Sequence, residues 1–307
     1  MSLEVNIDYE DETAQGLSRE EVAYFRKEGF VLPKEGLPQD VVRDMQGIID
    51  RVVRDNADWA NLLRMVHVPK RPGQLEGIIG GEDVFKLMFH PVLLKAAASI
   101  LGPNLIMWGS EMFAKPPGIG KGTPWHQDCY NPAIKSGAGA DRVTSLMVWI
   151  AVDNIDSGNG CLRFIPGSGR NGKVSHIQHG QTDALLNFEA DTATIDVSTA
   201  VDSVRAPGQF SIHDYYVIHG AEPNTSNRRR AGLTFHYISS EDMYDRSFGS
   251  ATGSGLKAPA PLAVRPIWLV LGENKNPAND FVTGHQGLED LDAYAEEARR
   301  KMTALIH

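Results

Sequence analysis

The stretch LIMWGSEMFAK (residues 105–115) begins a long region of short segments that are rich in β-branched and aromatic residues. Gly, Pro and Asn separate these segments, which is the pattern of short strands joined by turns. The later segments are RVTSLMVWIAVD (142–153), GCLRFIPGS (160–168), DSVRAPGQFSIHDYYVIHG (202–220) and RRAGLTFHYIS (229–239). The region therefore predicts an antiparallel β-sandwich or barrel.

Upstream of this region the apolar residues recur at helical spacing. Ser18 and Glu21 form a capping-box pattern at the start of a short amphipathic helix. A second helix is expected after Pro38, and a third over residues 84–101, where Gly and Pro follow as a stop signal. Helices followed by strands, without βαβ alternation, favour a β core wrapped by helices over a doubly wound sheet.

The absence of an internal repeat or linker favours one domain over residues 1–307. It would comprise a helical layer at about 17–102, a β core at about 104–240 and a C-terminal helix at about 287–305. The expected inner stripe of that helix is Leu288, Leu291, Ala295, Ala298 and Met302.

Composition narrows the classes of partner. An apolar content of 42% suffices for a sizeable core, and a net charge of −9 argues against a general nucleic-acid binder. The chain has only two cysteines, no secretory signal pattern and no apolar run long enough to span a membrane. We therefore expect a cytoplasmic protein with a small-molecule partner; the sequence does not indicate its oligomeric state.

The segment PWHQDCYNP (124–132) contains a candidate metal site. On a strand, His126 and Asp128 would project to the same face while Gln127 projects to the other. His219 ends a later strand segment and could complete a set of two histidines and one carboxylate, the facial triad of non-haem Fe(II) oxygenases. The alternative is an ordinary strand end whose polar residues happen to alternate.

Arg230 follows His219 by eleven positions. In a double-stranded β-helix the strand after the distal histidine returns antiparallel through the same barrel, so its guanidinium could bind a carboxylate by a two-pronged contact. A dicarboxylate such as 2-oxoglutarate needs that arrangement, with one end on the metal and the other on arginine.

The region from Pro116 to Arg230 resembles the phytanoyl-CoA dioxygenase family of Fe(II)- and 2-oxoglutarate-dependent oxygenases. The N-terminal LSREEVAYFRKEGFVLP (17–33) also resembles the opening helix of that family. The resemblance rests on KPPG (115–118), WHQD (125–128), VWIAVDNIDSGNGCLRFIPGS (148–168), APGQF (206–210) and IHGAEPNTSNRRR (218–230). It implies a double-stranded β-helix, or cupin-like jelly roll, with a helical N-terminal layer.

The resemblance also implies roles for particular residues. Iron would be bound by His126, Asp128 and His219, and the distal carboxylate of 2-oxoglutarate by Arg230. Trp149 matches a tryptophan that lines the co-substrate pocket, and Gln127 lies inside the co-substrate motif. Many members have a serine where this chain has Ala221, so one hydroxyl contact to 2-oxoglutarate is either missing here or supplied by Thr234.

The implied activity is oxidation by O2, with 2-oxoglutarate converted to succinate and CO2 and with ascorbate as a candidate stimulant. Hydroxylation of an unactivated C–H bond is the default outcome, and desaturation or ring closure by the same family is an alternative. Halogenases on this scaffold replace the carboxylate ligand by a small residue, so Asp128 argues against halogenation. A non-catalytic cupin-like binding protein and a Zn2+-dependent hydrolase or isomerase also remain open.

Other histidines and arginines are also candidates for the site. His213 lacks the ligand spacing, which favours a core or surface position, whereas the strand parity of His236 would direct it inward. Arg228 and Arg229 are typical of solvated loop charges. One short segment contains several basic residues, which are Arg64, His67, Lys70 and Arg71. We interpret this basic group as a solvated face rather than as a docking site for an anionic group of the substrate.

Three connecting segments are also classified. NIDSGNG (154–160) lacks the lysine and the helix of a phosphate-binding P-loop, so it is expected to be a turn. Residues 131–141 and 170–200 are expected to be surface loops, and loops of that length often act as lids.

Overall fold

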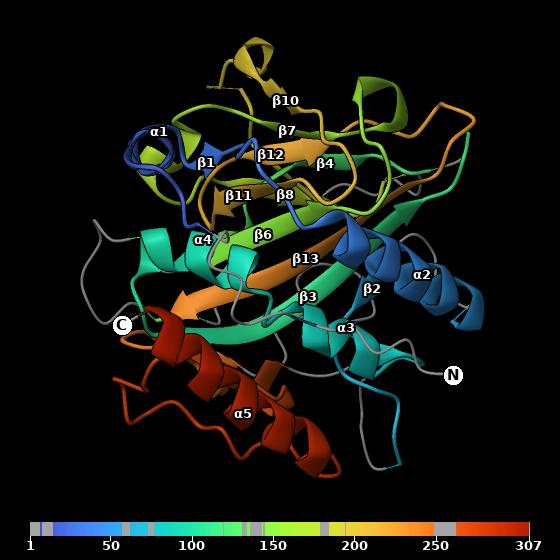
Figure 1. Cartoon of the computed structure of the whole chain (residues 1–307). Coiled ribbons are helices and arrows are strands. Elements are labelled where there is room, and N and C mark those ends of the chain that lie inside the picture. Colours follow the sequence, from blue (N-terminus) through green and yellow to red (C-terminus); the bar gives the residue numbers. More distant parts are fainter. Residues whose placement is uncertain are drawn as a thin grey trace.

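The protein is described from a computed structural model. The model describes residues 7, 15–56, 62–72, 77–118, 120–130, 134–135, 143, 145–178, 184–193, 195–248 and 262–306. Within these residues the fold is built on two larger antiparallel sheets, with helices outside the wider one (Figure 1).

The major sheet has seven strands in the order β1-β11-β6-β13-β3-β15, and β2 also pairs with β3. Its strands are β1 (Phe30–Val31), β2 (Leu62–Arg64), β3 (Leu105–Lys115), β6 (Ser145–Ala151), β11 (Phe210–Asp214), β13 (Arg230–Ser239) and β15 (Trp268–Leu271). Every residue of β6 and β13 is buried, because helices cover one face of these strands and the minor sheet covers the other.

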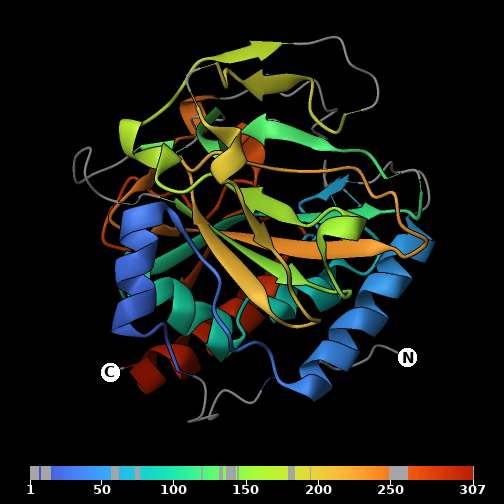
Figure 2. The ribbon, with the colours of Figure 1, turned by 90° about the horizontal axis from the view of Figure 1, so that it is seen from above.

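The minor sheet has the order β10-β7-β12-β4. Its strands are β4 (Thr123–His126), β7 (Leu162–Phe164), β10 (Val201–Ser203) and β12 (His219–Ala221). Two further pairs are β5 (Ile134–Lys135) with β14 (Met243–Tyr244) and β8 (His176–Gln178) with β9 (Phe188–Ala190). Seen from above, the short strands of the minor sheet lie over the long strands of the major sheet (Figure 2). Two facing antiparallel sheets confirm the predicted jelly-roll class.

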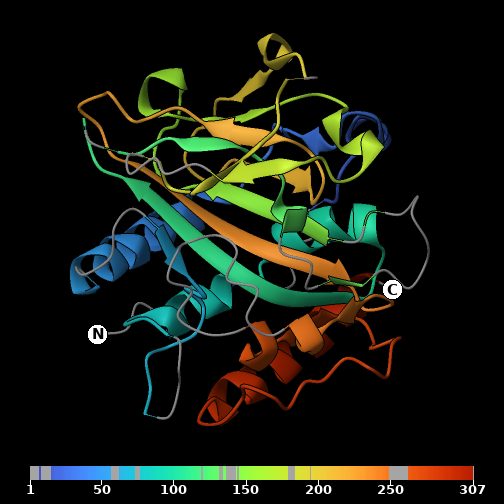
Figure 3. The ribbon, with the colours of Figure 1, turned by 180° about the vertical axis from the view of Figure 1, so that it is seen from behind.

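The helices are α1 (Arg19–Glu28), α2 (Gln39–Asp55), α3 (Gly81–Leu87), α4 (Pro91–Leu101) and α5 (Glu289–Ile306). The predicted capping box is present at α1, where the Ser18 side chain accepts from the Glu21 N–H and the Glu21 side chain accepts from the Ser18 N–H. Helix α5 packs on β15 below the major sheet (Figure 3), and the five predicted inner residues, of which Leu288 directly precedes the helix, are all buried.

The structure corrects two sequence predictions. The expected helix over 84–101 is two helices, because Pro91 lacks the N–H that a continuing helix needs. His90 caps the second helix by accepting from Val92 N–H. The β core also recruits strands from outside residues 104–240, since β1, β2 and β15 join the major sheet.

Among the described residues no single helix has both the length and the apolar character needed to cross a bilayer; only the bent pair of α3 and α4 reaches them together.

Candidate active site

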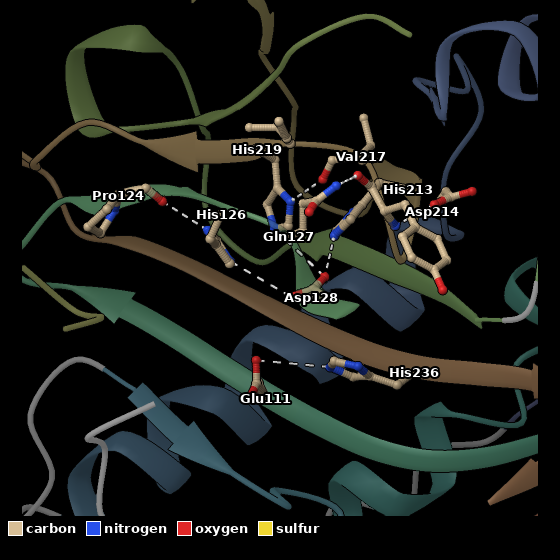
Figure 4. A network of polar contacts seen from close by, with 12 residues as sticks. Glu111, Pro124, His126, Gln127, Asp128, His213, Asp214, Val217, His219 and His236 are labelled. Atoms are coloured by element: carbon tan, nitrogen blue, oxygen red, sulfur yellow. Dashed lines mark hydrogen bonds and ion pairs between the residues drawn. The ribbon is translucent and has the colours of Figure 1, made fainter. Parts of the chain in front are cut away.

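Three predicted ligands meet where the minor sheet faces the major sheet. His126 ends β4 and His219 begins β12, and these two residues pair directly across the antiparallel ladder. Asp128 begins the short 3-10 turn that follows β4. One ligand atom from each of the three residues lies within 4.8 Å of the others (Figure 4), which is a geometry suited to one metal ion.

Backbone contacts orient both imidazoles. Nδ1 of His126 lies 2.9 Å from the Pro124 carbonyl oxygen, and Nδ1 of His219 lies 3.1 Å from that of Val217. A carbonyl oxygen only accepts, so each Nδ1 carries the proton and each Nε2 keeps a lone pair for a metal. Burial lowers the pKa of each ring to about 4, which keeps both imidazoles neutral at neutral pH.

Asp128 completes the set with a carboxylate. Burial alone would raise the pKa of Asp128, but His219, His213 and His126 together lower it below its usual value. The Asp128 oxygens lie 3.7 Å from His126 Nε2 and 3.8 Å from His219 Nε2. These separations leave room for an ion between the three groups.

His213 is the site residue that the sequence reasoning missed. Its ring is buried, as in a core histidine, but its Nε2 lies 3.3 Å from Asp128 Oδ2. The ring also lies beside His219, with centroids 4.5 Å apart. The alternation of side chains along β11 could have indicated that His213 projects into the pocket. His213 pairs with Met147 of β6, which also lines the pocket.

Arg230 begins β13 at the far end of the same pocket. Its side chain is 1% exposed, yet Nε and Nη2 have no hydrogen-bond partner among the described residues. Burial lowers the pKa of Arg230 to about 10, which still leaves it charged at neutral pH. A buried guanidinium with free donors fits a carboxylate ligand, and the distal end of 2-oxoglutarate supplies one.

Trp149 lies under this guanidinium, 4.7 Å from ring centroid to Cζ of Arg230. The indole fills a space that only glycine leaves open, since a Cβ on Gly232 would lie 1.9 Å from the ring. Trp149 Nε1 and Thr234 Oγ1 are buried without hydrogen-bond partners among the residues described, and both residues line the pocket. The arrangement is compatible with the predicted role of Thr234 in place of a hydroxyl at Ala221, which stays a prediction.

Gln127 differs from the other residues of the predicted set. Its amide nitrogen donates to the Gly172 and Tyr216 carbonyl oxygens, and its amide oxygen accepts from Val174 N–H. These contacts attach the strand end that carries the ligands to the chain around residue 173. A contact between Gln127 and the co-substrate stays a prediction.

The four residues of the basic group lie in different environments. The expectation of a solvated face is wrong for His67 and Arg64. His67 is fully buried, with Nδ1 2.6 Å from Ser110 Oγ, and Arg64 lines the pocket with a side chain only 12% exposed. Lys70 is exposed, and Arg71 forms an ion pair with Asp290 in α5. His236 points into the pocket, as its strand parity predicted.

The two remaining arginines form surface ion pairs. Arg228 pairs with Asp156 at 2.7 Å, and Arg229 pairs with Asp153 at 2.9 Å. Neither lines the pocket. The turn prediction for 154–160 is confirmed, since Asp156 caps a 3-10 turn there.

The loop predictions have different outcomes. Within residues 131–141 the structure describes only β5, and the lid prediction for the rest lies outside the described residues. The 170–200 segment is more than a surface loop, because Leu186 and Phe188 line the pocket and Phe188 lies against the His126 ring, with centroids 6.3 Å apart.

An antiparallel jelly roll with two histidines and one aspartate at one point, and a buried arginine in the same pocket, is the architecture of Fe(II)- and 2-oxoglutarate-dependent oxygenases. The chain belongs to the phytanoyl-CoA dioxygenase (PhyH) family, whose model matches residues 25–232. The enzyme class and its use of Fe(II) and 2-oxoglutarate predicted from the sequence are thus confirmed.

Relatives and solved structures agree with this assignment. The chain is 24% identical to the peroxisomal phytanoyl-CoA dioxygenase of Mus musculus, over 73% of this chain and 69% of the relative. It is 26% identical to the ectoine dioxygenase of Bordetella parapertussis, over 82% and 88%. The structure of CytC3 with Fe(II) and alpha-ketoglutarate has the same fold, with a TM-score of 0.58 and 22% identity over 86% of this chain and 92% of CytC3.

Proposed function

We propose that this enzyme hydroxylates an unactivated C–H bond of a small molecule. In the balanced reaction, one oxygen atom of O2 enters the substrate as a hydroxyl and the other enters succinate, as 2-oxoglutarate loses CO2. The observation that supports this proposal most strongly is the metal-binding triad in one pocket with a buried arginine that lacks hydrogen-bond partners at Nε and Nη2.

Each group in the pocket has a distinct part in this proposal. Two histidines and Asp128 would bind Fe(II), which supplies the chemistry of O2 activation and leaves coordination positions open for 2-oxoglutarate. Arg230 binds and orients the distal carboxylate of 2-oxoglutarate. Trp149 packs under that guanidinium and excludes water from the contact, which strengthens the charged interaction.

Succinate release tests the proposal directly. Purified protein with Fe(II), O2 and 2-oxoglutarate should form succinate slowly without a primary substrate, and faster with the correct one. His219→Ala and Asp128→Ala should abolish both rates while far-UV circular dichroism is unchanged, because the ligands lie at the ends of short strands and in a turn rather than in the hydrophobic core. Succinate release by His219→Ala at the wild-type rate would contradict the metal-site assignment.

A further inference from the structure

The pocket contains a second set of polar side chains beyond the metal ligands and Arg230. Arg64, Glu111 and His236 come from β2, β3 and β13, and all three line the pocket. In the strand ladder Glu111 pairs with Arg64 of β2 on one side and with Thr234 of β13 on the other, so Arg64, Glu111 and Thr234 share one face of the major sheet. His236 follows Thr234 by two positions and projects to the same face. We call Arg64, Glu111 and His236 the polar wall.

The contacts within the polar wall leave both ring nitrogens of His236 and Nε of Arg64 without hydrogen bonds among the described residues. Glu111 Oε1 lies 3.5 Å from Arg64 Nε, and Glu111 Oε2 lies 4.0 Å from His236 Nε2. His236 is 7% exposed, and neither of its ring nitrogens has a hydrogen-bond partner in the part of the chain that the structure describes. Arg64 Nε is also buried without one. Buried polar atoms are normally paired, since an unpaired one is costly, so a ligand is the natural partner for this set.

The polar wall faces the metal site. Figure 4 shows Glu111 and His236 on neighbouring strands, across the pocket from Asp128. Arg230 lies in a different part of the ladder, opposite Lys115 at the end of β3. Along this ladder Glu111 is four positions from Lys115 and His236 is six positions from Arg230, so the polar wall can contact a second molecule bound beside the metal while Arg230 contacts the distal carboxylate of the co-substrate.

The hydrogen-bonding groups of the polar wall indicate what kind of substrate can bind beside the metal. The Glu111 carboxylate only accepts hydrogen bonds, Arg64 only donates them, and a neutral His236 ring offers one donor and one acceptor, so a group that can donate to Glu111 and accept from its neighbours fits this set. Trp108 packs edge-on to His236 at 4.9 Å and donates its own N–H to Ser145, so it presents an apolar ring surface. A hydrocarbon chain in this space would leave both ring nitrogens of His236 unpaired and would offer no hydrogen bond to the Glu111–Arg64 ion pair.

We propose that the polar wall binds the primary substrate through a hydrogen-bond donor, either a hydroxyl or a protonated amine. The substrate is then a compact polar molecule rather than a long acyl chain. This inference rests on the proposed function, because it names the substrate class of the same pocket.

Probe-dependent succinate formation tests the inference. The polar probes are free amino acids, the matching α-hydroxy acids and monosaccharides, and the apolar probe is palmitoyl-CoA. Each polar probe is supplied at about 10 mM, above the Michaelis constants typical of enzymes. We expect at least one polar probe, and not palmitoyl-CoA, to raise succinate formation above the rate without a probe. Comparing amino acids with hydroxy acids separates an ammonium donor from a hydroxyl donor.

Variants then connect that stimulation to the polar wall. Glu111→Gln and His236→Phe should raise the probe concentration needed for half-maximal stimulation by roughly ten- to a hundredfold, as expected when a charged hydrogen-bond partner is removed. The Michaelis constant for 2-oxoglutarate should stay unchanged. The matched control is Glu189→Gln in β9, a half-buried position outside this pocket, and it should behave as wild type. Because Phe at 236 could disturb packing, Glu111→Gln decides the result if His236→Phe lowers the thermal midpoint.

The outcomes separate the two proposals. Absence of succinate without any probe in the wild-type protein contradicts the proposed function itself. If that succinate forms, three results overturn the inference alone: stimulation by palmitoyl-CoA only, stimulation by no probe, or stimulation by a polar probe that Glu111→Gln leaves unchanged.

Discussion

At the scale of single residues, the decisive feature is a buried guanidinium, that of Arg230, with nitrogens that form no hydrogen bond among the described residues. Arg230 is 1% exposed with two unpaired nitrogens, and its neighbours in sequence, Arg228 and Arg229, are both ion-paired. Two of three consecutive arginines are therefore ion-paired outside the pocket, and the third is buried within it. Only the one whose side chain enters the pocket is available for a ligand.

That contrast gives a matched pair of variants. Arg230→Ala should raise the Michaelis constant for 2-oxoglutarate by roughly thirty- to a thousandfold, because a two-pronged contact between charged groups is worth about 2–4 kcal/mol. Arg228→Ala removes only the ion pair with Asp156 and should change that constant by less than about twofold. Steady-state succinate kinetics measures both. Equal effects of the two variants would show that Arg230 has no special contact with the co-substrate.

His213 supports a second residue-scale prediction. Its Nε2 donates to Asp128 Oδ2, which leaves Oδ1 as the freer oxygen for the metal. His213→Phe should weaken Co(II) binding by about tenfold or more, as loss of an outer hydrogen bond to a ligand usually does. It should also alter the visible absorption of the Co(II) protein, which a purely structural role would not do. His213→Gln, which keeps a donor, should restore much of the affinity; failure of that rescue, with an unchanged spectrum, would remove the positioning role.

At the scale of elements, the strand ladder explains which site residues the sequence could predict. His126 and Asp128 are two residues apart, which made them a candidate pair, and the family resemblance of the sequence then supported His219, next to a turn glycine, as the third ligand. Register is non-local, so the sequence could not place Arg64 of β2 beside Glu111 of β3, nor His213 beside Asp128. The residues that β2 and β11 bring into the pocket were for this reason assigned to a solvated face or to the core.

Strands β3 and β13 also bury a lysine amine. Lys115 lies opposite Arg230, and its Nζ donates to the Glu222 carbonyl oxygen at 2.8 Å. Burial, with a smaller contribution from Arg230, lowers the pKa of Lys115 to about 6. The unfolded chain keeps this amine protonated to about pH 10, so it binds more protons than the folded chain between about pH 6 and pH 10.

The sign of the resulting pH dependence follows from that difference. The contribution of Lys115 to the free energy of unfolding should rise with pH across this window and be smallest below pH 6. Urea unfolding of the metal-free protein at pH 6 and pH 9 should show wild type gaining stability relative to Lys115→Met. The exposed Lys34→Met is the control and should give no such trend. Parallel pH profiles for wild type and Lys115→Met would show that the amine stays charged in the folded protein.

At the scale of the whole molecule, the site joins parts of the chain that fold together only in the complete jelly roll. The ligands come from the minor sheet and its following turn, whereas Arg230 and the polar wall come from the major sheet. Fold class and helical layer were predictable because periodicity is local. The contributions of β1, β2 and β15 to the major sheet were not, since short strands far from the core region carry little pattern of their own.

Ligand binding across the two sheets should therefore stabilise the whole fold. A ligand that binds only the folded state adds about 2.7 kcal/mol at a hundred times its dissociation constant, enough to raise the thermal midpoint by several degrees. Mn(II) alone should raise the midpoint, 2-oxoglutarate alone should do little, and both together should exceed Mn(II) alone, because the co-substrate contacts metal and arginine at once. His219→Ala should lose both increments, and Arg230→Ala should lose only the increment from 2-oxoglutarate. Differential scanning fluorimetry in which Arg230→Ala retains that second increment would place the co-substrate carboxylate away from Arg230 and separate the two ends of the pocket.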